Sequence, residues 1–511
     1  MKKLAVLWLS LLSLAMSPRS GYFNVLDYGA RPDGRTLCTK AIQKAIDACA
    51  AAGGGKVIIP AGRYLNRPLF LKNHVHVEVL AGATLLADTT ISAYPSCPGR
   101  WEGIERRVYA SLFTGFHLKD VSITGRGTLD GQGKTWWRAF LATRLLRKKA
   151  GIRKREAANP PGSPLKWPRP RVINLYSCQN VLIRDLTIVN SPSWTIHPVY
   201  CEDVTVENVR IRNPYDSPNT DGIDPESCRD VHIVNCFLDC GDDCIAIKSG
   251  YNEDGRRVNK PCENIVIANC TFRHGHSAVG IGSETSGGVW NVAVNNCVLK
   301  GTDRGLRVKT ARGRGNVVKN IRASNLVMEN VGTAISLNMF YGSRDETPHP
   351  VDETTPHARN IRISHITATD IQNAGEIKGL PEAPMSGVAL EDMNVQAKTG
   401  MTIAFVRGVE LRHVQVDVTE GPAFDVKKST NLTFEGITST SPPAETPVIV
   451  FEDARNVLVR ACRAYPGTDA FFLLKGKGNA DFYLLNNLFG QAKRPYRFSQ
   501  GASQTTIVEK K

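Results

Sequence analysis

The chain has 511 residues, of which 42% are hydrophobic and 22% charged, a composition that excludes a disordered protein and allows one large domain or two to three ordinary ones. Basic residues outnumber acidic ones by 64 to 48, and the net charge of +16 favours a polyanionic partner: nucleic acid, anionic lipid or an acidic polysaccharide. The thirteen cysteines include no CxxC pair, so they give no indication of metal or redox chemistry.

The segment 1–20 is typical of an export signal. Two basic residues, Lys2 and Lys3, precede an apolar run of twelve residues from Leu4 to Ala15. A run of this length is too short to span a bilayer, and no later stretch reaches about 18 apolar residues. We therefore expect a secreted or periplasmic protein with no membrane span, for which nucleic acid is a poor partner. A buried N-terminal strand is the alternative interpretation of this segment.

Residues 39–52 carry apolar side chains at helical spacing. This pattern predicts an amphipathic helix with Thr39 as its N-cap, ended by the glycines from Gly53 to Gly55. A helix at this place can cover the open end of a stack of strands, which would otherwise expose unpaired backbone groups.

Residues 138–170 end in a proline-rich stretch and are predicted to form an inserted loop. Within them lies the strongly basic run 144–155. This run fits either a solvated helix face or a contact with a polyanion.

A repeated segment dominates the rest of the chain. Clear copies begin at Cys178, Cys201, Cys228 and Cys262, and each holds two short β-branched runs separated by polar turn residues. The copies start 23, 27 and 34 residues apart, which leaves no room for a helix in each repeat. Coils of short strands stacked about 4.8 Å apart satisfy this spacing. We therefore predict an all-β fold, a parallel β-helix over residues 21–500.

Two residue types recur at fixed places in these repeats. The cysteines that open the copies are expected to point inward as small apolar residues, although a disulfide between Cys240 and Cys244 stays open. Asparagines recur at the turns, as at Asn208 and Asn264, where they tolerate left-handed backbone and can form hydrogen bonds along the stack.

Four short stretches concentrate polar residues that a plain coil does not need. Asp221 and Asp242 are 21 residues apart, close to one coil, so stacking places them on neighbouring coils. His276 follows 34 residues later, and Arg307 follows after a further 31. The residues expected to converge on one patch are therefore Asp221, Asp242, Asp243, His276, Arg307 and Lys309.

This combination suits the hydrolysis of a glycosidic bond. Crowded carboxylates raise the pKa of at least one of them, and a glycosidase needs one protonated and one ionised carboxyl group. Inversion would place the acid and the base roughly 6.5–9.5 Å apart, in a pair that includes Asp221. Arg307 and Lys309 alternate with Val308, so both can face a substrate carboxylate.

The four stretches resemble the signatures of glycoside hydrolase family 28, the polygalacturonases. The motifs are Asn219-Thr220-Asp221, Gly241-Asp242-Asp243, Gly275-His276-Ser277 and Arg307-Val308-Lys309, and the similarity covers about residues 22–460. This resemblance implies a right-handed, single-stranded parallel β-helix of the pectin-lyase type, without metal or cofactor. It also implies hydrolysis of α-1,4-galacturonosidic bonds with inversion, acting on pectin, polygalacturonate or oligogalacturonides.

The resemblance also implies a role for each site residue. Asp242 would be the general acid, Asp221 and Asp243 would activate water, and His276 would lie beside the acid. Substrate-binding positions would be Asn219, Arg307, Lys309 and Tyr341. Ser277 stands where the family has a second glycine and Val308 where it has isoleucine; only Ser277 puts the fine substrate preference in doubt.

Three other readings stay open. A pectate lyase would bind calcium through the same aspartates, a glycan-binding β-helix would not depend on them, and a related hydrolase would cut another pectic backbone. Extra segments at residues 138–170, 250–261 and 342–357 can wall one end of the site and favour exo-action.

Overall fold

The computed structural model describes residues 21–153, 155 and 159–510. The predicted export segment, residues 1–20, lies outside this part of the chain and stays a prediction. Among the described residues, no helix is long and apolar enough to cross a membrane.

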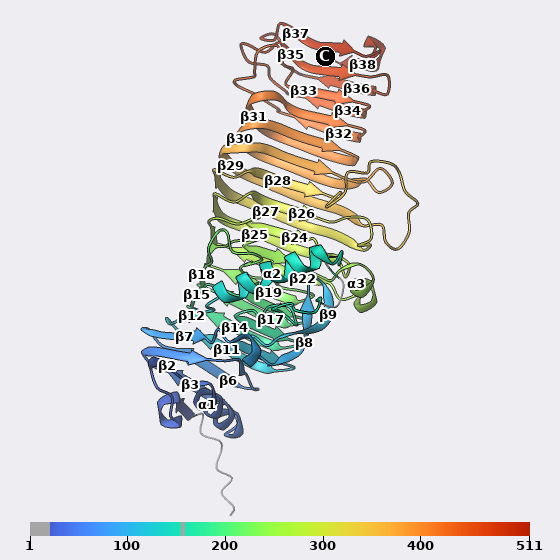
Figure 1. Ribbon diagram of the computed structural model, residues 1–511. Coiled ribbons are helices and arrows are strands. Elements are labelled where there is room, and N and C mark those ends of the chain that lie inside the picture. The colour runs from blue at the N-terminus through green and yellow to red at the C-terminus, as the bar shows by residue number, and fades with distance from the viewer. Residues whose placement is uncertain (1–20, 154, 156–158, 511) are drawn as a thin grey trace, which may run out of the picture.

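The chain forms a right-handed parallel β-helix, as the repeats and the resemblance predicted (Figure 1). Successive coils add parallel strands to the same sheet faces, and one face contains β14 (Gln179–Arg184), β17 (Glu202–Glu207), β19 (Arg229–Val234), β22 (Cys262–Ala268) and β25 (Val289–Lys300). Along this face Val204, Val231 and Ile265 align in register and are buried. The alternation seen in the sequence therefore fills the inside of the coils.

The recurring cysteines and asparagines lie as predicted. All thirteen cysteines are buried and free, so Cys240 and Cys244 form no disulfide. The turn asparagines adopt left-handed backbone and form a ladder: the Asn291 amide donates to Asn264 Oδ1 at 2.9 Å, and that of Asn320 donates to Asn291 Oδ1 at 2.9 Å. These hydrogen bonds join turns of consecutive coils.

Helix α1 (Thr39–Ala51) covers the N-terminal end of the stack, below β2 (Asp33–Leu37) and β3 (Gly55–Ile59) in Figure 1. Its buried face consists of Ile42, Ala45, Ile46 and Cys49. The predicted N-cap is wrong by one residue, because Cys38 occupies the cap position without a side-chain hydrogen bond. The Thr39 hydroxyl instead accepts a hydrogen bond from the Arg67 amide at 2.8 Å.

The segment predicted as an inserted loop, residues 138–170, begins within helix α2 (Lys134–Lys149), which crosses the outside of the coils in Figure 1. Its anchor is Trp136, a fully buried ring that packs edge-on against Tyr94 at 5.0 Å and Tyr109 at 5.3 Å. This aromatic cluster explains why the segment docks on the coils as a helix.

The other two extra segments differ from each other. Residues 250–261 contain the short helix α3 (Asn252–Val258), which lies beside the antiparallel pair β8 (Ser96–Trp101) and β9 (Ile104–Tyr109). Residues 342–357 follow β28 (Thr333–Asn338) as a mostly exposed loop that projects from the stack in Figure 1.

Candidate active site

The site is built from turns that occupy the same place in consecutive coils. Asp221 lies between β18 (Arg210–Arg212) and β19, and the Asp242-Asp243 pair lies between β20 (Phe237–Asp239) and β21 (Ile245–Ile247). The Gly222 amide donates to the Asp243 carbonyl at 3.0 Å, and the Cys244 amide donates to the Ser277 carbonyl at 2.8 Å. The coil spacing therefore brings these turns together, as the sequence predicted.

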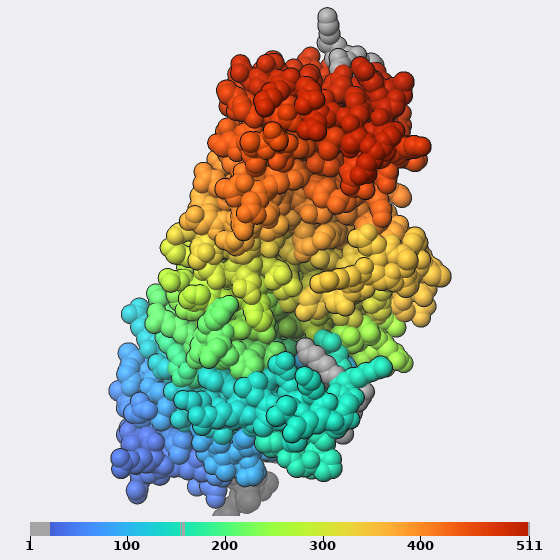
Figure 2. Space-filling view, turned by 45° about the horizontal axis from the view of Figure 1, so that its top comes forward, coloured from blue at the N-terminus to red at the C-terminus, as the bar shows by residue number. Residues whose placement is uncertain are grey.

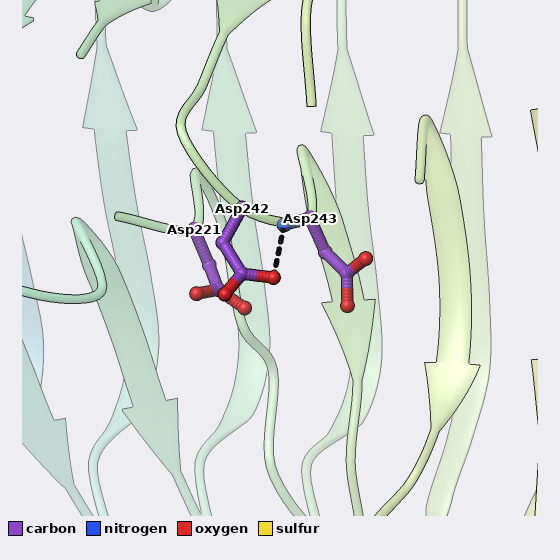
Figure 3. Close-up of side chains that lie close together, drawn as sticks. All are labelled: Asp221, Asp242 and Asp243. Atoms are coloured by element: carbon purple, nitrogen blue, oxygen red, sulfur yellow. Dashed lines mark hydrogen bonds between the residues drawn. The ribbon is translucent and has the colours of Figure 1, made fainter. Parts of the chain in front are cut away.

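The three aspartates converge closely, and their side chains project from the adjoining turns in the same direction (Figure 3). One oxygen from each of Asp221, Asp242 and Asp243 lies within 4.8 Å of the others, and Asp242 Oδ1 accepts a hydrogen bond from the Asp243 amide at 2.9 Å. The nearest oxygens are thus closer than the roughly 6.5–9.5 Å expected between the carboxyl groups of an inverting pair. The distance between these carboxyl oxygens therefore does not by itself predict hydrolysis with inversion of the anomeric configuration.

His276 precedes β24 (Val279–Gly282) and reaches Asp242. Its Nδ1 lies 2.9 Å from Asp242 Oδ1. The preceding Gly275 has φ +148°, and a Cβ there would lie 2.7 Å from the Asp242 carbonyl oxygen, so glycine is needed for this close approach.

The three clustered aspartates are less exposed than a surface turn suggests. Asp221 and Asp243 are 3% and 1% exposed, and only Asp242 and His276 reach the surface appreciably. Burial, followed by the negative charges of Asp224 and Asp242, raises the pKa of Asp221 well above its usual range. Burial also raises the pKa of Asp242, but the hydrogen bond and charge of His276 outweigh it and bring this pKa to about 2.

The predicted carboxylate-binding residues lie on β26 (Arg304–Lys309) and divide into two kinds. Lys309 is buried and its ammonium group binds Asp243 Oδ2, so it belongs to the aspartate cluster. Arg307 contacts Ser277 Oγ at 3.5 Å, and its guanidinium group lies 5.5 Å from the centre of the Tyr341 ring. Arg307 and the exposed Tyr341 are thus placed to meet a ligand.

Asn219 is held between an arginine and the catalytic cluster. Its Oδ1 accepts a hydrogen bond from Arg169 Nη2 at 2.8 Å, and its amide nitrogen lies 3.4 Å from Asp242 Oδ2. Arg169 is buried, and this burial lowers its pKa to about 9. Its guanidinium group lies 3.9 Å from the Phe140 ring of α2, so the inserted segment is connected to Asp242 through Arg169 and Asn219.

Sequence reasoning missed a buried lysine beneath the aspartates. Lys248 Nζ lies 3.6 Å from Asp221, 3.5 Å from Asp224 and 3.9 Å from Glu284. Lys248 directly follows the apolar strand β21, so in the sequence it resembles a solvated strand end, but in the structure the Trp194 ring covers its ammonium group at 4.2 Å. In the sequence, the acidic residues Asp224 and Glu284 were the signal that could have indicated a cation paired beneath the aspartates.

A large cavity opens between the turns that carry the aspartates and the inserted segment. It measures about 770 Å³ and has Asp242 and His276 on one wall. The facing wall carries basic and aromatic side chains, namely Phe140, Arg144, Arg147, Lys148, Lys166 and Trp167. In Figure 2 the surface is hollowed between the teal segment that carries α2 and the yellow loop after β28. The basic run 144–155 therefore contributes to a cavity wall.

The extra segments 250–261 and 342–357 contribute residues to a second cavity. Tyr251, Asn252 and Gly342 line a separate cavity of about 330 Å³ beside Tyr341. Two basic side chains of residues 250–261 are engaged with protein groups: Arg256 binds the Gly313 carbonyl and Arg257 pairs with Glu105.

The aspartate cluster is also the place where a divalent cation would find three carboxylate oxygens. Two ammonium groups of the chain already lie against it, Lys309 at Asp243 and Lys248 at Asp221. These lysines balance part of the negative charge that a cation would otherwise balance.

Comparison with known proteins agrees with this geometry. Residues 49–410 match the family model described as Glycosyl hydrolases family 28. The chain belongs to this family. It is therefore a glycoside hydrolase, and the resemblance drawn from its four motifs is confirmed.

Individual relatives of this family 28 enzyme differ in their mode of attack. The exopolygalacturonase of Thermotoga maritima is 32% identical, with a TM-score of 0.68 over 78% of this chain and 91% of its own. A probable polygalacturonase of Vitis vinifera is 34% identical over 75% of each chain. The endo-polygalacturonase of Pectobacterium carotovorum subsp. carotovorum is 31% identical over 62% of this chain and 75% of its own. Sequence identity to these relatives therefore does not distinguish an exo-acting from an endo-acting enzyme.

Proposed function

We propose that this enzyme hydrolyses α-1,4-galacturonosidic bonds of polygalacturonate and pectin by acid-base catalysis. One observation carries this proposal: Asp242 of the aspartate cluster and His276 line a cavity that also has basic side chains, and Arg307 contacts Ser277, the residue after His276. The cationic groups suit a chain that has a carboxylate on each sugar.

Asp242 and His276 together supply the proton for the leaving oxygen. Asp242 is the most exposed of the three aspartates and forms part of the cavity wall. The hydrogen bond with Asp242 raises the pKa of His276, so below that pKa the imidazole holds a proton next to the carboxylate. Because the pKa of Asp242 is lowered, the proton is held by the pair and passes through Asp242 to the substrate.

Asp221 and Asp243 position and deprotonate the attacking water. A raised pKa makes Asp221 a stronger base once it is ionised. Lys309 holds the neighbouring Asp243 carboxylate in place. Attack by this water opposite the leaving oxygen gives inversion, which the family resemblance implies.

Asn219, Arg307, Lys309 and Tyr341 are proposed to bind the substrate. Arg307 binds a sugar carboxylate, the Tyr341 ring packs against a sugar face, and Asn219 orients the acid through Asp242. Lys309 acts mainly through Asp243, since its ammonium group is buried there.

Exo-action is favoured by the wall that the inserted segment builds. Helix α2 and the residues after it face the catalytic turns across the cavity, with Arg144 and Lys148 available for sugar carboxylates. Such a wall limits how far a chain can extend beyond the catalytic residues. We infer release of mono- or digalacturonate from the non-reducing end.

The enzyme is further proposed to act outside the cytoplasm, either secreted or in the periplasm. The basic start and apolar run of residues 1–20 support export. The proposed partner, an acidic cell-wall polysaccharide, is consistent with that location.

Product analysis tests the proposal directly. Purified enzyme should release galacturonate or digalacturonate from polygalacturonate while viscosity falls slowly, and NMR of fresh product should show the inverted anomer. An ultraviolet-absorbing unsaturated product that disappears with chelator would identify a lyase. Binding without any product would identify a glycan-binding module.

A further inference from the structure

Asp221 touches the solvent-facing catalytic groups on one side and a buried pair of opposite charges on the other. Lys248 Nζ lies 3.6 Å from Asp221 and 3.5 Å from Asp224, and the side chains of all three are at most 5% exposed. Neither carboxyl oxygen of Asp224 has a hydrogen-bond partner. The proposed acid-base mechanism uses neither Lys248 nor Asp224.

Neighbouring side chains hold the Lys248 ammonium group in place. The Trp194 ring lies 4.2 Å from Lys248 Nζ, and Glu284 lies on its far side at 3.9 Å. Glu284 is itself bound by Arg155 at 3.1 Å. The Lys248 ammonium group is therefore almost fully buried, between three carboxyl groups and an aromatic ring.

Resting on the proposed function, we propose that Lys248 and Asp224 tune the proton affinity of Asp221 from the protein interior, Lys248 lowering it and Asp224 raising it. Both act as positioning residues, because neither reaches the cavity that the substrate would enter. Lys248 Nζ lies at nearly equal distances from Asp221 and Asp224, so one ammonium group is shared by the two carboxyl groups, and a change at Asp224 alters how much of its charge acts on Asp221.

The sign of each effect follows from charge. The charged groups that face Asp221 are Asp224, Asp242, Asp243, Lys248 and, further off, Arg169. Loss of the Lys248 charge removes the main attraction for ionised Asp221, so its pKa should rise. Burial raises the pKa of Asp224 to about 8, so it repels ionised Asp221 only in its own ionised form; removing that form should lower the pKa of Asp221.

The test is the pH dependence of kcat/KM on polygalacturonate for Lys248→Met, Asp224→Asn and the double variant. The acid limb, where the base becomes protonated, should move upward by about 1 pH unit or more in Lys248→Met and downward in Asp224→Asn. In the double variant, the acid limb should return toward its wild-type position. Lys248→Arg is the matched control that retains the charge.

Opposite shifts with similar plateau rates would support the inference. A lower rate at every pH with an unmoved limb in Asp224→Asn, or shifts in the same direction, would overturn it. If Lys248→Met does not fold, Asp224→Asn decides alone, since the change conserves shape. A wild type without hydrolytic activity would defeat the proposed function, whereas an active wild type with unmoved limbs would defeat only this inference.

Discussion

His276 and Asp242 are joined twice in this structure. The His276 backbone amide donates to the Asp242 carbonyl oxygen at 3.0 Å, and His276 Nδ1 lies 2.9 Å from Asp242 Oδ1. The backbone bond fixes the distance between two coils, and the side-chain bond places an ionisable proton at the cavity wall. In the proposed mechanism this pair supplies the proton for the leaving oxygen.

Replacing His276 by glutamine should lower kcat by about 10²-fold and alter the alkaline limb of the pH profile. The pKa of His276 is raised, so the imidazole is protonated at low pH and loses its proton as pH rises through that pKa. The rate should fall in the same interval. His274→Gln is the control, because His274 pairs with Asp239 outside the aspartate cluster. Equal profiles for the two variants would contradict the role of His276.

Asp242→Asn should cost at least about 10²-fold in kcat, since its amide cannot pass a proton to the leaving oxygen. The variant should still fold but unfold at a somewhat lower temperature, because the lowered pKa of Asp242 shows that His276 stabilises its ionised form, whereas Asn conserves the shape of the side chain. Asp239→Asn, which alters the neighbouring pair with His274, should retain activity. Near-normal turnover by Asp242→Asn would remove this residue from the mechanism.

The double change Arg144→Glu and Lys148→Glu should raise KM for polygalacturonate by about tenfold or more. Both side chains line the cavity, and the change replaces attraction for sugar carboxylates by repulsion. Arg138→Glu makes the same kind of charge change on the same helix outside the cavity lining. Initial rates over a range of substrate concentrations measure the effect, and equal KM values for both variants would show that α2 does not contact substrate.

Glu226→Gln should reduce the free energy of unfolding by about 3–5 kcal/mol. The buried Glu226 binds Arg100 Nε at 3.0 Å and His197 Nε2 at 3.0 Å, so neutralising it leaves the Arg100 charge without its main partner. Urea denaturation followed by fluorescence measures the change. Glu202→Gln breaks an exposed pair with Arg229 and should leave stability unchanged. A small effect of Glu226→Gln would mean that Arg100 finds another partner.

The coil architecture and the catalytic turns were predictable from sequence. Asp221 and Asp242 are separated in the sequence by about one coil, and parallel strands of successive coils stack in register. The two residues therefore lie on neighbouring turns, independently of the conformation of the loops between them. The same reasoning placed Arg307 and Lys309 on one side of their strand. Periodicity along the chain determined these relationships.

Only the tertiary structure decided what surrounds those turns. From the sequence, Lys248 is expected to be a solvated lysine at the end of a strand. Its burial against Asp221 depends on Trp194 and Glu284, which lie tens of residues away in the sequence. The inserted segment likewise became a cavity wall through the packing of Trp136 against Tyr94 and Tyr109. Short-range spacing is fixed by backbone geometry, whereas burial and charge pairing depend on which distant side chains fill the same space.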